Sequence, residues 1–384
     1  MDGTTLRDVR KRAGVSLARM AELTSFHKST LGHYETGERR ITTEVVQAYE
    51  KALGTTLRDE DMNRRELLKA AAGLAATEPL LRLVDELVVP AQSTARVGMS
   101  EVEAVRQATG FAAAMDFQFG GEHAVRIGSG SLTWSVKLLD GSMTPDTRRA
   151  LSSAVGALAD RVAYSLHDSE QRSQALKIAT LAVRASSEGD DPTLRTHVLI
   201  DIASFTARSS PREGVSILRP SFNDKKIYSQ ERANVHFAAA RMLANDKRPH
   251  EALDCFRAGE KILSKDPATD APASVGFIRT PGHWDSVTGG VLMRIGQEMD
   301  PRQAKPVFGE AVARLTSAFN TFGPDRGRAK ALLLVKLARL EMDLGDLGAA
   351  HDLTSQAEAR SAEVQSRRLR TFVSELRSGL AQRA

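Results

Sequence analysis

The sequence predicts an all-α protein, and three observations lead to this fold class. Aromatic residues make up only 5% of the 384 residues, whereas Ala, Leu, Arg and Glu, which suit helices, are abundant. Runs of alternating β-branched residues are absent from the sequence, and even the apolar run Leu87–Val89 ends at Pro90. Apolar residues instead recur at helical spacing between short turns, which is typical of helical bundles and solenoids.

The composition indicates a soluble protein of several domains in a reducing compartment. Hydrophobic residues make up 41% and charged residues 26% of the chain, enough to bury sizeable cores. Cys255 is the only cysteine, which excludes an intrachain disulfide and a zinc site built on paired cysteines. No run reaches the roughly 18 apolar residues of a membrane span. The net charge of +5 permits a polyanionic partner.

The first domain, residues 1–57, is predicted to contain four or five short helices. The clearest patterns cover residues 6–13, 17–23, 28–35 and 43–53. Gly14, Gly37 and Gly54 are placed to end three of these helices, and Ser16 is a good N-cap for the second. Only a short break at Thr24–Phe26 separates the second helix from the third. Two short helices joined by such a turn form a helix-turn-helix arrangement.

A set of residues at fixed spacing runs through this domain. The set is Gly14-Val15-Ser16, Met20-Ala21-Glu22, Phe26, Ser29-Thr30-Leu31 and Tyr34-Glu35-Thr36-Gly37. It resembles the Cro/XRE helix-turn-helix family of phage repressors, and the resemblance covers residues 5–57 nearly end to end. It implies that the helix from Lys28 is a recognition helix, which enters the DNA major groove where base edges are distinguishable.

The resemblance also implies roles for individual residues of this domain. The residues expected to face DNA are His27, Lys28, Ser29, Thr30 and His33. The residues expected to contact phosphates, and so to position the domain without reading sequence, are Arg19, Arg39 and Arg40. Arg10 and Glu35 correspond to an internal ion pair with a structural role. A solvated charged surface on a protein-interaction module is the alternative interpretation.

Two residues depart from the family pattern. Leu17 stands where the family often has a glutamine that contacts a phosphate and supports the recognition helix. His27 stands at a helix entry that is often serine, and it is a poorer cap. Neither residue breaks the predicted fold, but both leave the base preference open.

Residues 58–100 are predicted to form a helical linker. The run Arg64-Arg65-Glu66-Leu67-Leu68-Lys69 followed by alanines resembles a twin-arginine export signal. It begins some sixty residues into the chain, however, and Lys69 interrupts its apolar part. A linker helix between two domains is therefore the expectation.

The third region, residues 101–384, contains a weak repeat of small residues. Its anchor positions are Ala175, Val215, Ala252, Ala304 and Ala350, and aromatic or small residues follow them at similar spacing. The pattern resembles the second helix of tetratricopeptide repeats, although the period exceeds the usual 34 or so residues. The resemblance implies an α-solenoid of helix pairs with a concave surface. Residues 369–380 are expected to form a terminal capping helix. An irregular helical bundle is the alternative.

The same resemblance implies which side chains line the concave surface, at set positions of each first helix. These are Asp160, Tyr164, His167, His197, Ser204, Asn234, Arg241 and Arg339. Arg241 and Asn234 form the pair best suited to a peptide, because Arg binds a carboxylate with two donors and Asn can bind an extended backbone. Ordinary solvated polar residues are the alternative interpretation for each position.

The sequence offers no catalytic constellation. Its nine histidines form no His-Glu-x-x-His or Cys/His cluster. Gly128-Ser129-Gly130-Ser131 lacks the lysine of a phosphate-binding loop. The run from Gly282 to Asp285 is interpreted as a loop that enters a helix rather than a reactive site. We therefore expect no enzyme activity, no cofactor and no metal.

Taken together, the chain resembles actinobacterial regulators that join an XRE helix-turn-helix to a tetratricopeptide-like region through an Arg-Arg-x-Leu-Leu linker. It is expected to be a sequence-specific transcriptional regulator that binds double-stranded DNA as a homodimer. The repeat region is expected to dimerise, to sense a peptide, small-molecule or protein effector, or both. The expected location is the cytoplasm, at the nucleoid and with no membrane partner. The alternative function is a non-catalytic interaction adaptor or an antitoxin-like partner protein.

Overall fold

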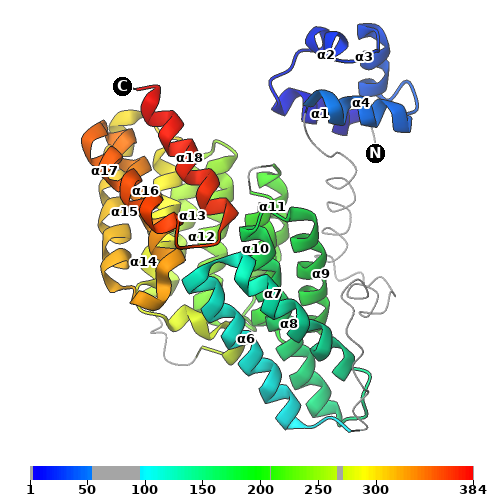
Figure 1. The fold of residues 1–384 in the computed structure, drawn as a ribbon, viewed down its shortest axis with the longest axis vertical. Helices are drawn as coiled ribbons and strands as arrows, with labels where there is room; N and C mark the ends of the chain where they lie inside the picture. The colour runs from blue at the N-terminus through cyan, green and yellow to red at the C-terminus, as the bar shows by residue number, and fades with distance from the viewer. Residues whose placement is uncertain (1–2, 54–95, 208, 266–270, 384) are drawn as a thin grey trace. The chain divides into compact units, whose positions relative to one another are not determined.

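The computed structural model of the protein describes residues 3–53, 96–207, 209–265 and 271–383 (Figure 1). The chain divides into two compact units, residues 1–73 and 74–384. Throughout the described residues the regular structure is helical and no strand occurs, which confirms the predicted fold class. No helix in these ranges has both the length and the apolar character that a membrane crossing needs. Most of the predicted linker helix, with its Arg64-Arg65 run, lies outside the described residues.

The N-terminal unit has helices at the positions that the turn signals predict. They are α1 (Gly3–Arg12), α2 (Leu17–Leu23), α3 (Lys28–Thr36) and α4 (Thr43–Leu53). The Ser16 hydroxyl caps α2 by accepting the Arg19 N–H at 3.1 Å. Gly37 ends α3 with φ at +80°, a left-handed conformation that glycine adopts without steric cost. Side chains from all four helices form one small apolar core: Leu6, Met20, Leu31, Tyr34, Val45, Val46 and Tyr49.

The second unit is a series of antiparallel helix pairs (Figure 1). The pairs are α6 (Met99–Phe119) with α7 (Gly121–Leu138), α8 (Pro145–Asp168) with α9 (Arg172–Glu188), α10 (Pro192–Phe205) with α11 (Pro211–Leu218), α12 (Ser229–Asn245) with α13 (Pro249–Leu263), α14 (His283–Gly296) with α15 (Pro301–Thr321), and α16 (Gly327–Leu344) with α17 (Leu347–Ser361). Helix α18 (Arg367–Ala381) follows the last pair. Short 3₁₀ helices are η2 (Arg219–Ser221), η3 (Ala273–Arg279) and η4 (Pro324–Arg326). The predicted helical-repeat arrangement is confirmed.

The small residues that predicted the repeat all lie on the second helix of a pair. Ala175, Ala252, Ala304 and Ala350 are almost fully buried there, on α9, α13, α15 and α17. Gly259 on α13 shows why small residues are needed, since a Cβ at this position would lie 2.8 Å from the Phe237 ring. The paired helices therefore approach closely at these sites.

The two ends of the repeat array are in contact, which the sequence did not predict. The Gln365 N–H donates to the Phe119 carbonyl at 2.7 Å, and α18 packs against α8 as well as α16 and α17. Gly120 permits this approach, because a Cβ there would lie 2.5 Å from the Gln365 carbonyl oxygen. The apolar face predicted for α18 is buried at Leu369 and Val373. Helix α18 thus joins the last pair to the first, rather than covering a free end.

Candidate functional site

Helix α3 presents a polar face to solvent. His27, Lys28, Ser29 and His33 are exposed, and Thr30 is partly buried. On the opposite side of the helix, apolar side chains such as Leu31 belong to the core. The His27 imidazole caps the helix weakly, since its Nδ1 accepts the Ser29 N–H at 3.4 Å. The side chains predicted to face DNA therefore lie together on and beside one exposed helix face.

A buried network fixes the end of α3 relative to α1 and α4. The Arg10 guanidinium donates twice to the Glu35 carboxylate, with both donor–acceptor distances at 2.6 Å. A third Arg10 donor binds the Val15 carbonyl at 2.7 Å, and the Tyr49 hydroxyl donates to Glu35 at 2.8 Å. The hydrogen bond to Glu35 raises the pKa of Arg10, and burial raises the pKa of Tyr49. Such two-point charged pairs restrict geometry strongly, so this network holds the polar face of α3 in place.

Leu17 on α2 gives α3 an apolar support. Its side chain packs against the core cluster of the domain. A Cβ at Gly32 of α3 would lie 3.7 Å from Leu17 Cδ2, an ordinary contact distance. Leu17 therefore supports α3 by packing between α2 and α3.

The side chains predicted to contact DNA differ in what they already bind. Arg19 pairs with Glu22 at 2.6 Å, and His33 pairs with Glu38 at 2.5 Å, all four side chains being exposed. The hydrogen bond from His33 lowers the pKa of Glu38. Three exposed cations among them have no carboxylate partner in the described residues of the chain. These are Lys28, Arg39 and Arg40, of which Arg39 lies 5.9 Å from the Tyr34 ring centre.

A comparison with protein families identifies this domain. Residues 3–64 match the family model of a helix-turn-helix domain. No curated protein and no solved structure matches the chain. The helix-turn-helix domain indicates a DNA-binding regulator, because α3 then has the position of a recognition helix.

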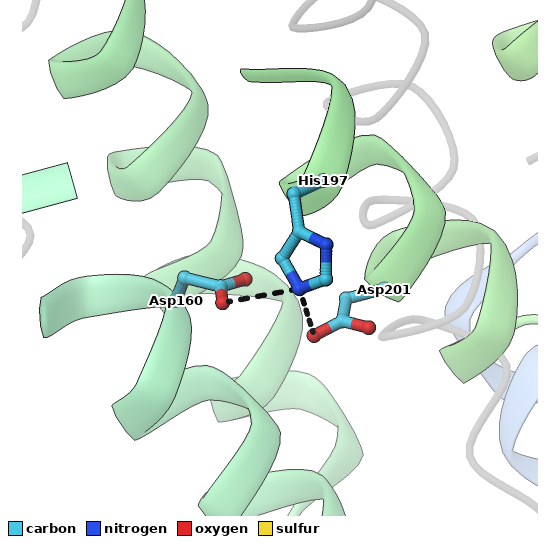
Figure 2. Close-up of side chains that lie close together, drawn as sticks. All are labelled: Asp160, His197 and Asp201. Carbon is cyan, nitrogen blue, oxygen red and sulfur yellow. Dashed lines mark ion pairs between the residues drawn. The ribbon is translucent and has the colours of Figure 1, made fainter. Parts of the chain in front are cut away.

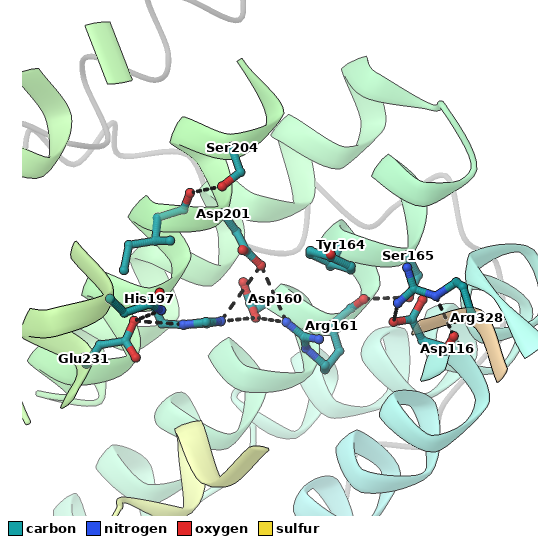
Figure 3. Close-up of polar contacts among 12 residues, drawn as sticks. Asp116, Asp160, Arg161, Tyr164, Ser165, His197, Asp201, Ser204, Glu231 and Arg328 are labelled. Carbon is teal, nitrogen blue, oxygen red and sulfur yellow. Dashed lines mark hydrogen bonds and ion pairs between the residues drawn. The ribbon is translucent and has the colours of Figure 1, made fainter. Parts of the chain in front are cut away.

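The second unit gathers several of the predicted groove residues in a buried carboxylate cluster (Figures 2 and 3). His197 Nδ1 lies 2.9 Å from Glu231, and its Nε2 lies 3.9 Å from Asp160 and 4.0 Å from Asp201. Arg161 pairs with Asp160 at 2.9 Å and with Asp201 at 3.5 Å. Of the predicted residues, Asp160 and His197 belong to this cluster directly, and Asn234 joins it by donating to Glu231 at 3.1 Å.

The environment of the carboxylate cluster shifts two pKa values upward. Burial alone would lower the pKa of His197, but the charge and hydrogen bond of Glu231 outweigh it and raise the pKa to about 9. Burial and the charge of Asp160 raise the pKa of Asp201 to about 6. His197 is therefore a cation at neutral pH, and with Arg161 it balances most of the carboxylate charge.

Asp160, His197 and Asp201 also have the residue types of a metal site. Their ligand atoms lie within 4.8 Å of one another, and all three side chains are buried. The Arg161 guanidinium, however, already supplies a positive charge to both carboxylates. No metal-binding sequence motif marks this group, because its members come from two separate helices, α8 and α10.

A second buried network lies beside the first, with Tyr164 between the two (Figure 3). Arg328 on α16 contacts Asp116 on α6, and it pairs with Asp168 on α8 at 3.0 Å. Burial raises the pKa of Asp116, whereas Arg328 overcomes the effect of burial at Asp168 and lowers its pKa. The Arg161 and Arg328 guanidiniums lie 5.2 and 5.6 Å from the Tyr164 ring centre.

The remaining predicted groove residues are partly buried and fall into separate places. Arg241 hydrogen-bonds Ser204, and the His167 ring stacks on Phe205 with 4.4 Å between ring centres. Arg339 instead contacts Glu375 of α18. The resemblance thus selected residues on the first helices of the pairs, but not one continuous open lining.

Sequence reasoning missed the other charged residues that lie among and beside these side chains. They are Asp116, Arg161, Asp168, Asp201, Glu231, Arg328, Lys336 and Arg368. A signal was present in α10, where His197 and Asp201 are one turn apart among apolar neighbours. Charged residues inside an apolar helix usually have buried partners. The partners of His197 and Asp201 come from α8 and α12, and no local pattern encodes these contacts.

Proposed function

We propose that the protein is a non-catalytic, sequence-specific transcriptional regulator with a domain of the Cro/XRE type. The observation that supports this function best is the exposed polar face of α3, held in place by the buried Arg10–Glu35 pair. Lys28 is suited to donate to guanine O6 or N7, and Ser29 to contact either kind of base. Arg19, Arg39 and Arg40 bind phosphates on either side of the groove.

We further propose that the regulator acts as a homodimer on two-fold related DNA half-sites. Paired helix-turn-helix domains bind half-sites about 34–36 Å apart. In this proposal the helical-repeat region, of the tetratricopeptide type, forms the dimer and receives an effector. The position of the small anchor residues on the second helices of four pairs supports the repeat type. Effector control then means that the two DNA-binding domains reach, or fail to reach, the spacing of one helical turn.

Selection of bound fragments from genomic DNA by the full chain provides the first test. The double variant Lys28→Ala/His33→Ala is then compared with Lys51→Ala, which removes an exposed charge from α4. Each lost base contact costs about 1–3 kcal/mol, so we expect binding to the selected site to weaken by about tenfold or more. Lys51→Ala should bind the selected site like the parent chain.

A salt series separates this function from a protein-interaction role. Affinity for DNA falls steeply with rising salt, because bound phosphates release counterions. A packed protein interface responds little to salt. If no fragment is enriched, or if the double variant keeps the parent's footprint, the proposed function is wrong.

A further inference from the structure

Three basic side chains converge between the first helices of the repeat array. They are Arg241 on α12, Lys336 on α16 and Arg368 on α18, called here the basic cluster. Arg241 donates to Ser204 on α10. Lys336 Nζ lies 3.4 Å from the Ser286 carbonyl, and Arg368 lies 3.4 Å from the Tyr164 hydroxyl on α8. Residues of six helices thus surround one region, since Ser286 lies on α14.

The basic cluster has more positive charge than its neighbours balance. Burial and the charges of Arg241 and Arg368 lower the pKa of Lys336 to about 8, and burial lowers the pKa of Arg241. Asp168 pairs with Arg368 at 3.4 Å but is shared with Arg328 at 3.0 Å. Asp201, the carboxylate that acts on Arg241, already pairs with Arg161. The cations therefore repel one another.

Hydrogen-bond donors in this region remain unused. Within the described residues, the buried Nε atoms of Arg241 and Arg368 have no hydrogen-bond partner. Native proteins satisfy most such groups, so unused buried donors next to excess charge indicate a missing acceptor. Gly290 on α14 lets the lysine pack closely against this helix, since a Cβ there would lie 2.7 Å from Lys336 Nζ.

We infer that the basic cluster, with the hydroxyls of Ser204 and Tyr164, binds a small dianion that carries a phosphate group or two carboxylates. Two forked guanidiniums and an ammonium match the oxygen geometry of these groups. The contact between the first and last helix pairs, and the burial of the donors, favour a small molecule over a peptide. The binding site itself does not depend on the proposed function. Only the further step, that this dianion is the effector of the regulator, rests on it.

Binding is measured by calorimetry and thermal unfolding of the full chain, without DNA. The probes are inorganic phosphate, pyrophosphate and succinate, with glycerol as an uncharged control. We expect at least one dianion to bind saturably and to raise the Tm. Lys336→Met and Arg241→Gln should each weaken binding at least tenfold, whereas Arg302→Gln, at an exposed site on α15, should not change it.

If Lys336 has a purely structural role, Lys336→Met should lower the Tm of the ligand-free protein. If the cluster awaits a dianion, Lys336→Met relieves repulsion and the ligand-free Tm stays the same or rises. The inference is overturned if no probe binds saturably, or if the probes raise the Tm of all variants equally. Dianion binding without an effect on DNA affinity would reject the effector role alone. Sequence-specific DNA binding without dianion binding would reject the site but leave the proposed function standing.

Discussion

At the scale of single residues, both units depend for their stability on buried charges that are paired. In the helix-turn-helix domain, Arg10 and Glu35 form a pair that is almost completely buried. In the repeat region, His197 and Arg161 lie among three buried carboxylates. Charges in such places are costly unless they are paired, so loss of one partner has a larger effect than any surface substitution.

Glu35→Ala should destabilise the helix-turn-helix domain strongly. It leaves the Arg10 charge buried without its partner, which costs about 3–5 kcal/mol. Hydrogen exchange of α1 and α3 in the full chain measures the effect. Glu38→Ala removes an exposed carboxylate from the same region and should change protection little. Equal protection in the parent chain and in Glu35→Ala would show that the pair does not hold α3.

His197 should make the repeat region less stable as the pH rises. Its pKa is raised to about 9 in the folded chain, against 6.5 for the ordinary side chain. The stabilisation is therefore fully present below pH 6.5 and is lost as the pH rises through 9. It amounts to about 3 kcal/mol. Urea unfolding of the parent chain and of His197→Gln between pH 6.5 and 10 measures this stabilisation. The difference between their free energies of unfolding cancels the opposite trend of Lys336, which both chains contain. A difference that does not change with pH would contradict a charged His197.

At the scale of helices, local sequence signals predicted the helices of the first unit, the last helix of the second unit and the second helices that carry small residues. Ser16, Gly37 and the prolines that open α8 and α10 mark helix ends by their own chemistry. Ala252 and Phe256 predicted α13 as the second helix of a pair, because close approach requires a small residue there. The region before α14 was less predictable, since the 3₁₀ helix η3 has no periodic pattern.

The orientation of α3 gives a prediction that distinguishes phosphate contacts from base contacts. Arg40→Ala should weaken binding to all DNA sequences alike and reduce the slope of log affinity against log salt by about 1. Lys28→Ala should instead relax the preference at one position of the site. Fluorescence anisotropy with selected and scrambled duplexes over a salt series measures both. A loss of preference in Arg40→Ala would place that residue at a base edge.

At the scale of the whole repeat unit, the contact between its ends was the feature that sequence could not predict. Arg328, Asp116 and Asp168 lie far apart in the chain, and no spacing relates them. Repeat arrays usually unfold as a series of neighbouring units. A charged network that joins the first pair to the last is expected to make this unit unfold more cooperatively.

Arg328→Met should therefore loosen both ends of the array at once. It leaves two buried carboxylates without their shared cation, at a cost of about 3–5 kcal/mol. Hydrogen exchange should increase in α6 and α18 together, whereas the exposed Arg302→Met should leave it unchanged. Faster exchange confined to α16 would mean that Arg328 stabilises its own helix but does not join the ends.

The position of α3 on DNA is tested most directly by chemical protection of the bases. Dimethyl sulfate methylates guanine N7 in the major groove, the atom that Lys28 is proposed to bind. On a selected site, the full chain should protect guanine N7 in each half-site. Lys28→Ala should lose protection of one guanine and keep the others, while Lys51→Ala keeps them all. An unprotected major groove at a site that the protein binds specifically would contradict the account.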